Sequence, residues 1–227
     1  PEQQVTVGDE HDAARAGRGQ DARLAALGVV EQQAPQGELG RRSAEAEDAG
    51  LLELGGHVRR LARLELDDVA AGEPQHFSLD TDTSMNSHTY RAALLSAGAA
   101  VQATDAVLAG ELENAFCCIR PPGHHACGDK AMGFCFFNNV AIAAKYAVAR
   151  HRLERVAIID FDVHHGNGTE DIVAGDERIL MCSFFQHPFY PEGGSLKNDA
   201  NLVNCPVPAY TKGMDVRELV EMMWMPR

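Results

Sequence analysis

Residues 1–76 lack most of the large side chains that fill protein cores. They contain no Phe, Tyr, Trp, Ile, Met or Cys, and no Lys, while every aromatic residue and all six cysteines lie from Phe77 onward. Short amphipathic stretches without such side chains would pack poorly by themselves. We therefore divide the chain into an atypical low-aromatic segment, residues 1–76, and a domain, residues 77–227. The first segment stays unassigned, either as a weakly folded extension or as sequence foreign to the domain.

The chain also lacks an apolar run long enough to span a membrane, and its first residues lack a secretory signal pattern. The cysteines form no C-x-x-C pair, which argues against a cysteine-bound structural zinc site. Without an export signal, they are expected to be buried free thiols in a reducing compartment. We expect a cytoplasmic protein with no membrane partner.

Positive charge is scarce, with 20 Lys and Arg against 33 Asp and Glu and a net charge of −13. A protein that coats nucleic acid needs the opposite balance, so no direct nucleic-acid binding is expected. An acidic surface is compatible with cationic substrates. The length of 227 residues allows one sizeable hydrophobic core.

Helix and strand patterns alternate in the second part of the chain. Three segments have helical spacing: residues 89–109, 137–150 and 215–224. Three apolar runs are typical of buried strands: AFCCI (115–119), VAIIDF (156–161) and ILMCSF (179–184). Such alternation implies right-handed βαβ units. The predicted fold class is therefore α/β, a three-layer α/β/α arrangement around a mainly parallel sheet.

Two histidine-rich motifs follow predicted strands, where parallel sheets bind their ligands. The second, DVHHGNG, follows VAIIDF. Since side chains alternate along a strand, Asp160, Asp162 and His164 are expected to project to one face. Unpaired polar groups there would be costly, and a metal removes that cost. An Asp and a His two residues apart can both reach one Zn²⁺ at about 2 Å. The alternative is a strand end whose polar groups meet solvent.

The first motif, RPPGHHA, places His124 and His125 behind a Pro-Pro-Gly corner. Neighbouring side chains diverge unless the loop turns, so both rarely bind one metal. Beside a metal-bound water, one histidine can accept a proton and the other can give one to a leaving amine. Each needs a partner on its far nitrogen, for which Asp160 and Asn167 are candidates. Read by itself, such a pair is more often a surface or loop feature, so the functional interpretation depends on the two motifs together.

Several long strings in one order give the chain a family resemblance. RPPGHHA, MGFCFFNNVAIAA and VAIIDFDVHHGNGTEDI resemble the metal-dependent histone deacetylase family, in its class II and bacterial deacetylase-like branch. The resemblance runs from Asp80 to Arg227 and implies an arginase/deacetylase-like fold. It implies zinc-dependent hydrolysis of the acetyl amide of acetyl-lysine in proteins. Two alternatives stay open, a deacetylase of small acetylated amines such as polyamines and a non-catalytic binding protein of this fold. Homo-oligomerisation is also left open.

The resemblance also implies residue roles. A catalytic Zn²⁺ would take two of its three ligands from Asp162 and His164. The acid/base pair would be His124, oriented by Asp160, and His125, oriented by Asn167. An acyl-lysine tunnel would be lined by Gly133, Phe134 and Tyr190. A structural K⁺ would be held by oxygen atoms of Asp160, Asp162, His164, Ser183 and Phe184. His165 is implied to lie behind the ligands rather than to be one.

Two functional residues of the family find no match here: the third zinc ligand, an Asp, and a Tyr that hydrogen-bonds the oxyanion. Tyr210 comes too early in the order of motifs to be that tyrosine. A lost oxyanion donor alone costs roughly 10²–10³-fold in rate. We therefore expect the chain to be an incomplete catalytic domain, with weak zinc binding and negligible turnover by itself.

Overall fold

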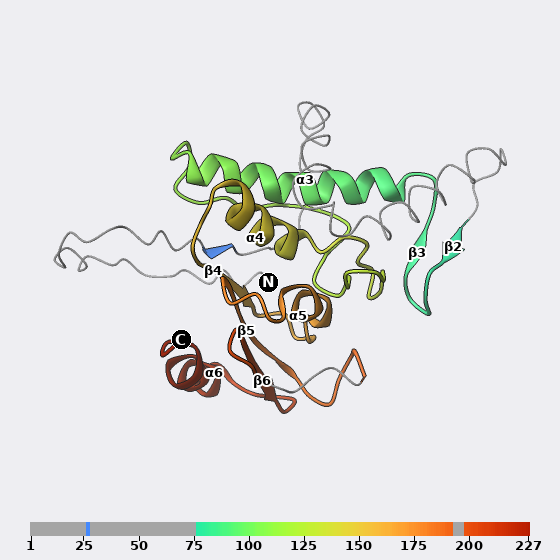
Figure 1. Cartoon of the computed structure of the whole chain (residues 1–227). Helices are drawn as coiled ribbons and strands as arrows, with labels where there is room; N and C mark the ends of the chain where they lie inside the picture. Colours follow the sequence, from blue (N-terminus) through green and yellow to red (C-terminus); the bar gives the residue numbers. More distant parts are fainter. Residues whose placement is uncertain (1–25, 28–75, 193–197) are drawn as a thin grey trace, which may run out of the picture.

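The computed structural model of the chain describes residues 26–27, 76–192 and 198–227. Its centre is a parallel sheet in the order β1-β4-β5-β6. The four strands are Ala26–Leu27 (β1), Val156–Asp160 (β4), Ile179–Gln186 (β5) and Leu202–Val207 (β6). A separate antiparallel pair, Phe77–Ser78 (β2) and Ser84–Met85 (β3), precedes the first long helix (Figure 1).

Two helices lie together on one face of the sheet (Figure 1). They are Thr89–Leu108 (α3) and Asn139–Arg150 (α4). The start of α4 is fixed by Asn138, whose side chain accepts a hydrogen bond from the backbone N–H of Ala141 at 3.1 Å. Further along the chain are Asn167–Val173 (α5), Gly213–Leu219 (α6) and a π-helical continuation, Val220–Trp224 (η1).

The core lies on both faces of the sheet because strand side chains alternate. On one face Ile158 and Met181 pack with alanines of α4 and with Val173 of α5. On the other face Cys182 and Val203 form a cluster with residues of α6 and η1 packed against it. The molecule therefore has three layers, helices, parallel sheet and helices. The predicted fold class is confirmed.

The predicted strand AFCCI was wrong. Residues 115–119 are irregular, Phe116 is 55% exposed, and only Ile119 is buried. An apolar run indicates burial but not hydrogen-bonded pairing, and within the described ranges the place beside β4 is taken by β1. The elements β6 and α5 were not predicted, while both long helices and the strands β4 and β5 were.

Two further expectations from the sequence concern membrane-spanning segments and the cysteines. Across these residues no helix combines the length and the apolar content that a bilayer crossing requires. All six cysteines are free, as predicted. Burial is confirmed for Cys135, Cys182 and Cys205, whereas the other three are only half-buried.

Candidate active site

The site forms where β4 ends. The strand stops at Asp160, earlier than predicted, and a loop leads into α5. In this loop the N–H of Asp162 donates to Asp160 Oδ1 at 3.1 Å, and the N–H of His164 donates to Asp162 Oδ1 at 2.7 Å. In these two turns a side chain accepts from the backbone two residues on, which links Asp160, Asp162 and His164. Phe161, Val163 and the Asp162 side chain are all about half-exposed, so hydrogen bonds, and not alternating burial, bring the three predicted residues together.

Asp162 and His164 bring two metal-binding atoms together. Asp162 Oδ1 lies 2.9 Å from His164 Nδ1, near the separation of about 3.3 Å for two ligands on one tetrahedral zinc. Burial would raise the pKa of Asp162, but the hydrogen bond from the His164 N–H and the nearby charge of His124 hold it below its usual value. Zinc fits this pair. The described residues contain no cluster of three or more such ligands, so a catalytic zinc, which normally has three protein ligands, would need one from outside them.

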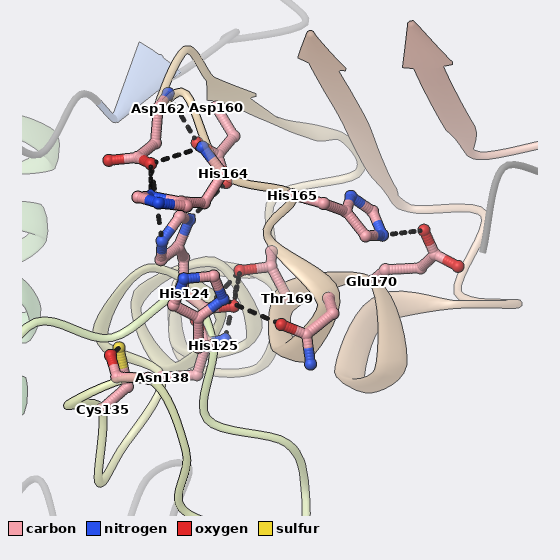
Figure 2. A network of polar contacts seen from close by, with 12 residues as sticks. His124, His125, Cys135, Asn138, Asp160, Asp162, His164, His165, Thr169 and Glu170 are labelled. Atoms are coloured by element: carbon pink, nitrogen blue, oxygen red, sulfur yellow. Dashed lines mark hydrogen bonds and ion pairs between the residues drawn. The ribbon is translucent and has the colours of Figure 1, made fainter. Parts of the chain in front are cut away.

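His124 stands between two carboxylates. Its Nδ1 lies 3.0 Å from Asp160 Oδ2, the expected pairing, and its Nε2 lies 4.0 Å from Asp162 Oδ1 (Figure 2). Burial would lower the pKa of His124, but the hydrogen bond to Asp160 and its charge raise it above the usual value. A side chain at Gly166 would collide with Asp160 Oδ2, so glycine allows the carboxylate to lie against this turn.

His125 is held differently. Its Nδ1 lies 2.8 Å from Asn167 Oδ1, again the expected pairing, and its ring centroid is 4.0 Å from that of His124. Burial, with a further contribution from the charge of His124, lowers the pKa of His125 to about 4. Gly133, at φ +56°, lies flat against the ring, where a Cβ would collide with it. At neutral pH His125 is therefore uncharged.

Aromatic rings surround the histidines. Tyr190 meets His125 edge-on with centroids 5.0 Å apart, as expected for a wall residue. Phe189, which the sequence analysis did not single out, stacks on His164 at 5.0 Å with an interplanar angle of 10°. Phe134 is 61% exposed. Phe189 directly precedes Tyr190 in the sequence, and this position was the signal that could have identified it.

The turn that contains Phe134 is held by a hydrogen bond to Thr83, which lies in a segment far away in the sequence. Phe134 has φ +64°, a left-handed conformation that bulky residues rarely adopt. Its N–H donates to the hydroxyl of Thr83, which is fully buried, at 3.1 Å. Thr83 is in turn fixed by Asp80, whose Oδ1 accepts from the Thr83 N–H at 2.8 Å. Thr83 was not predicted as a site residue, although the Asp-Thr-Asp-Thr run at residues 80–83 indicates such a turn.

Ser183 carries an unpaired buried hydroxyl. The β4–β5 register places it beside Asp160, and its Oγ has no hydrogen-bond partner. A buried hydroxyl without a partner is costly, and an oxygen-coordinated cation such as K⁺ would remove that cost. The Phe184 ring stacks on Trp224 at 5.6 Å, within the cluster on the α6 side of the sheet. Phe184 could therefore contribute only its carbonyl.

His165 does not join the cluster. It is buried and points away from His164 toward Glu170, with Nε2 3.1 Å from Glu170 Oε2 (Figure 2). This distance allows an ion pair, although the two atoms are misaligned for a hydrogen bond. Glu170 also accepts a hydrogen bond from Asn204 Nδ2 at 2.6 Å. His165 thus lies apart from the pair formed by Asp162 and His164.

Comparisons with known proteins give the same family throughout. A family described as histone deacetylase domain matches residues 20–227, and so begins within the segment that composition left unassigned. A histone deacetylase-like amidohydrolase of Pseudomonas aeruginosa is 51% identical over 122 residues, 54% of this chain and 32% of the relative. A probable deacetylase of Archaeoglobus fulgidus is 45% identical over 139 residues, 59% and 38% respectively. The chain thus spans about a third of the length of these relatives.

Two solved structures are similar in fold. The HDA15 HD domain superposes with a TM-score of 0.59 at 31% identity, covering 79% of this chain and 48% of that one. An acetylpolyamine aminohydrolase from Burkholderia pseudomallei superposes with a TM-score of 0.57 at 38% identity, covering 63% and 44%.

Proposed function

The chain belongs to the histone deacetylase family, and from this membership we propose that it hydrolyses the acetyl amide of acetyl-lysine side chains in proteins, with zinc as its metal. One observation carries the proposal. His124 and His125 are each held through Nδ1 by a separate partner, Asp160 or Asn167, beside the converging atoms of Asp162 and His164. This is the arrangement that metal-assisted hydrolysis with two proton-transfer groups needs.

The two histidines are suited to different tasks. Zinc, when bound by Asp162, His164 and a third ligand from outside the described residues, would supply polarisation of the acetyl carbonyl and acidification of a water molecule. His125 is neutral at pH 7 and can accept a proton at Nε2. Asp160 raises the pKa of His124, which favours the protonated ring; in that form His124 can stabilise developing negative charge and give a proton to the departing amine.

The surrounding residues suit a long aliphatic side chain and a structural cation. The exposed faces of Phe134, Phe189 and Tyr190 can cover the methylenes of an acylated lysine. We propose that K⁺ binds beside Ser183, where the backbone carbonyls of residues 160, 162, 164 and 184 would be its other ligands.

A second substrate class is favoured by the acidic residues near Tyr190. Burial, and then the charges of Asp82 and Asp80, raise the pKa of Tyr190 to about 12. Carboxylates at this side of the site would attract a substrate that keeps further positive charges, such as an acetylated polyamine. The similarity to an acetylpolyamine aminohydrolase supports the same alternative.

Acetate release tests the proposal and separates the alternatives. The catalytic domain, completed with the third metal ligand and the oxyanion tyrosine that find no match in this chain, is stripped of metal, re-supplied with zinc, and assayed with an acetyl-lysine peptide and with an N-acetylated polyamine. We expect zinc-dependent release, faster from the peptide. Preference for the polyamine would favour the second class. Zinc binding without release from either substrate would refute the enzyme and favour a binding protein.

A further inference from the structure

The side-chain amide of Asn167 faces a histidine with its oxygen atom and two sulfur atoms with its nitrogen atom. Its Oδ1 faces His125 Nδ1 at 2.8 Å. Its Nδ2 faces the sulfur atoms of Met132 at 3.4 Å and of Cys127 at 3.6 Å. An amide is nearly symmetric in shape, so a rotation by 180° would exchange the two ends without altering packing. The neighbours must therefore decide which end faces the histidine.

The two sulfur atoms do not discriminate equally between these orientations. A thioether has lone pairs and no hydrogen, so Met132 can accept a hydrogen bond but cannot donate one. The amide NH₂ group can bond to it, whereas a rotated Oδ1 would face lone pairs. The thiol of Cys127 lies 3.8 Å from the carbonyl oxygen of His125 and can donate its hydrogen there, but that hydrogen can also turn toward a rotated Oδ1, so Cys127 discriminates less strictly than Met132.

The orientation of Asn167 decides which nitrogen of His125 carries the proton. With Oδ1 toward the ring, Nδ1 must carry the hydrogen, and Nε2 keeps its lone pair. With NH₂ toward the ring, Nδ1 must accept, and the hydrogen moves to Nε2. We propose that Met132 is a positioning residue, whose thioether fixes the amide of Asn167 and thereby keeps Nε2 of His125 free to accept a proton.

Met132 is itself held in place. Its N–H donates to the carbonyl of Cys135 at 3.1 Å, and the N–H of Cys135 donates back at 2.9 Å. These two bonds close the turn that places Gly133 against the ring of His125. The residue that sets the tautomer is thus built into the same turn that contacts the ring.

The tautomer can be observed directly by NMR, and the measurement does not require enzymatic activity. In metal-free protein labelled with ¹⁵N-histidine, long-range ¹H–¹⁵N spectra at pH 7 distinguish the two neutral forms, and His125→Gln assigns the signal. We expect the Nδ1–H form in the unaltered protein and a mixture with the Nε2–H form in Met132→Leu, which preserves volume. Cys127→Ala, and Met85→Leu in the core, should keep the Nδ1–H form. An unchanged tautomer in Met132→Leu, or a mixture in Cys127→Ala, overturns the proposal.

Replacement of the amide provides a rescue. A carboxylate has no second end that donates, so in Asn167→Asp the additional change Met132→Leu should leave the tautomer as Nδ1–H. A mixture in this double variant would mean that Met132 acts through general packing, which contradicts the proposal. This variant also keeps the test open if the single Met132→Leu variant does not fold.

The kinetic consequence rests on the proposed deacetylase function. Weak hydrogen bonds to sulfur suggest a fall in kcat of about two- to fivefold for Met132→Leu with KM unchanged, and no further fall in the Asn167→Asp background. A tautomer shift in Met132→Leu without any turnover by the completed catalytic domain would refute the proposed function and leave the role of Met132 intact. Turnover by the unaltered protein with the same kcat in Met132→Leu would overturn that role.

Discussion

The buried His125 should make the protein lose stability in mild acid. Its folded-state pKa is lowered to about 4, against about 6.5 for an unfolded chain. Between these values the unfolded state binds a proton and the folded state does not, so the contribution of His125 is present above pH 6.5 and is lost as pH falls. Linkage gives a loss of about 2.5 kcal/mol at pH 4.5 relative to neutral pH. That is a substantial part of the 5–15 kcal/mol typical of a domain.

Neighbouring groups do not produce the same slope. The raised pKa of His124 has the opposite sign, and its contribution is complete below pH 6.5 and lost above that value. The lowered pKa of Asp162 matters only below its ordinary value of 3.8. The window from pH 6.5 to 4.5 therefore isolates His125 among these three.

Urea unfolding of the metal-free protein, followed by circular dichroism at pH 6.5 and 4.5, measures the effect. His125→Gln is the comparison, since it removes the titrating group and keeps a polar side chain beside Asn167. We expect the unaltered protein to lose about 2 kcal/mol more than the variant between the two pH values. Equal losses in the two proteins would show that His125 is not held neutral and would refute the reasoning.

Three further predictions follow from the surroundings of the site. Thr83→Val, which removes the acceptor for the N–H of Phe134, should raise KM roughly three- to tenfold with kcat little changed, while Thr83→Ser stays near the unaltered value; an unchanged KM would contradict this role of Thr83. Ser183→Ala should abolish the difference in Tm between potassium and tetramethylammonium buffers, and persistence of that difference would exclude this potassium site. Gly133→Ala should lower the free energy of unfolding by about 2 kcal/mol or more, because the methyl meets the His125 ring at a positive φ; a stability loss under 0.5 kcal/mol would contradict the packing.

The sequence predicted the elements whose signal is local. Residues 89–108 have helical spacing and end before Gly110, and the apolar run of β4 could be recognised directly. The run AFCCI has equal apolar content and forms no strand, because pairing depends on a neighbour that the run itself does not specify. The strand β6 lies in NLVNCPVPAY, where two prolines and two asparagines weaken the strand pattern.

The contacts of the site also fall into those that the sequence predicted and those that it did not. The pairings of His124 with Asp160 and of His125 with Asn167 were predicted, since motif resemblance carries them as a set. The contacts of Thr83 with Phe134 and of Met132 with Asn167 join residues 51 and 35 positions apart. Such contacts depend on how a turn docks against another segment, and nothing in their local sequence specifies the partner.

The proposal that Asp162 and His164 hold the metal while His124 moves protons is tested most directly by a pair of variants. Zinc content and acetate release are measured together in the protein that carries these residues, for His124→Ala and for Asp162→Ala. We predict that His124→Ala retains zinc and loses turnover by at least 10²-fold, whereas Asp162→Ala loses both zinc and turnover. Undiminished zinc content in Asp162→Ala, or undiminished turnover in His124→Ala, would contradict the assignment.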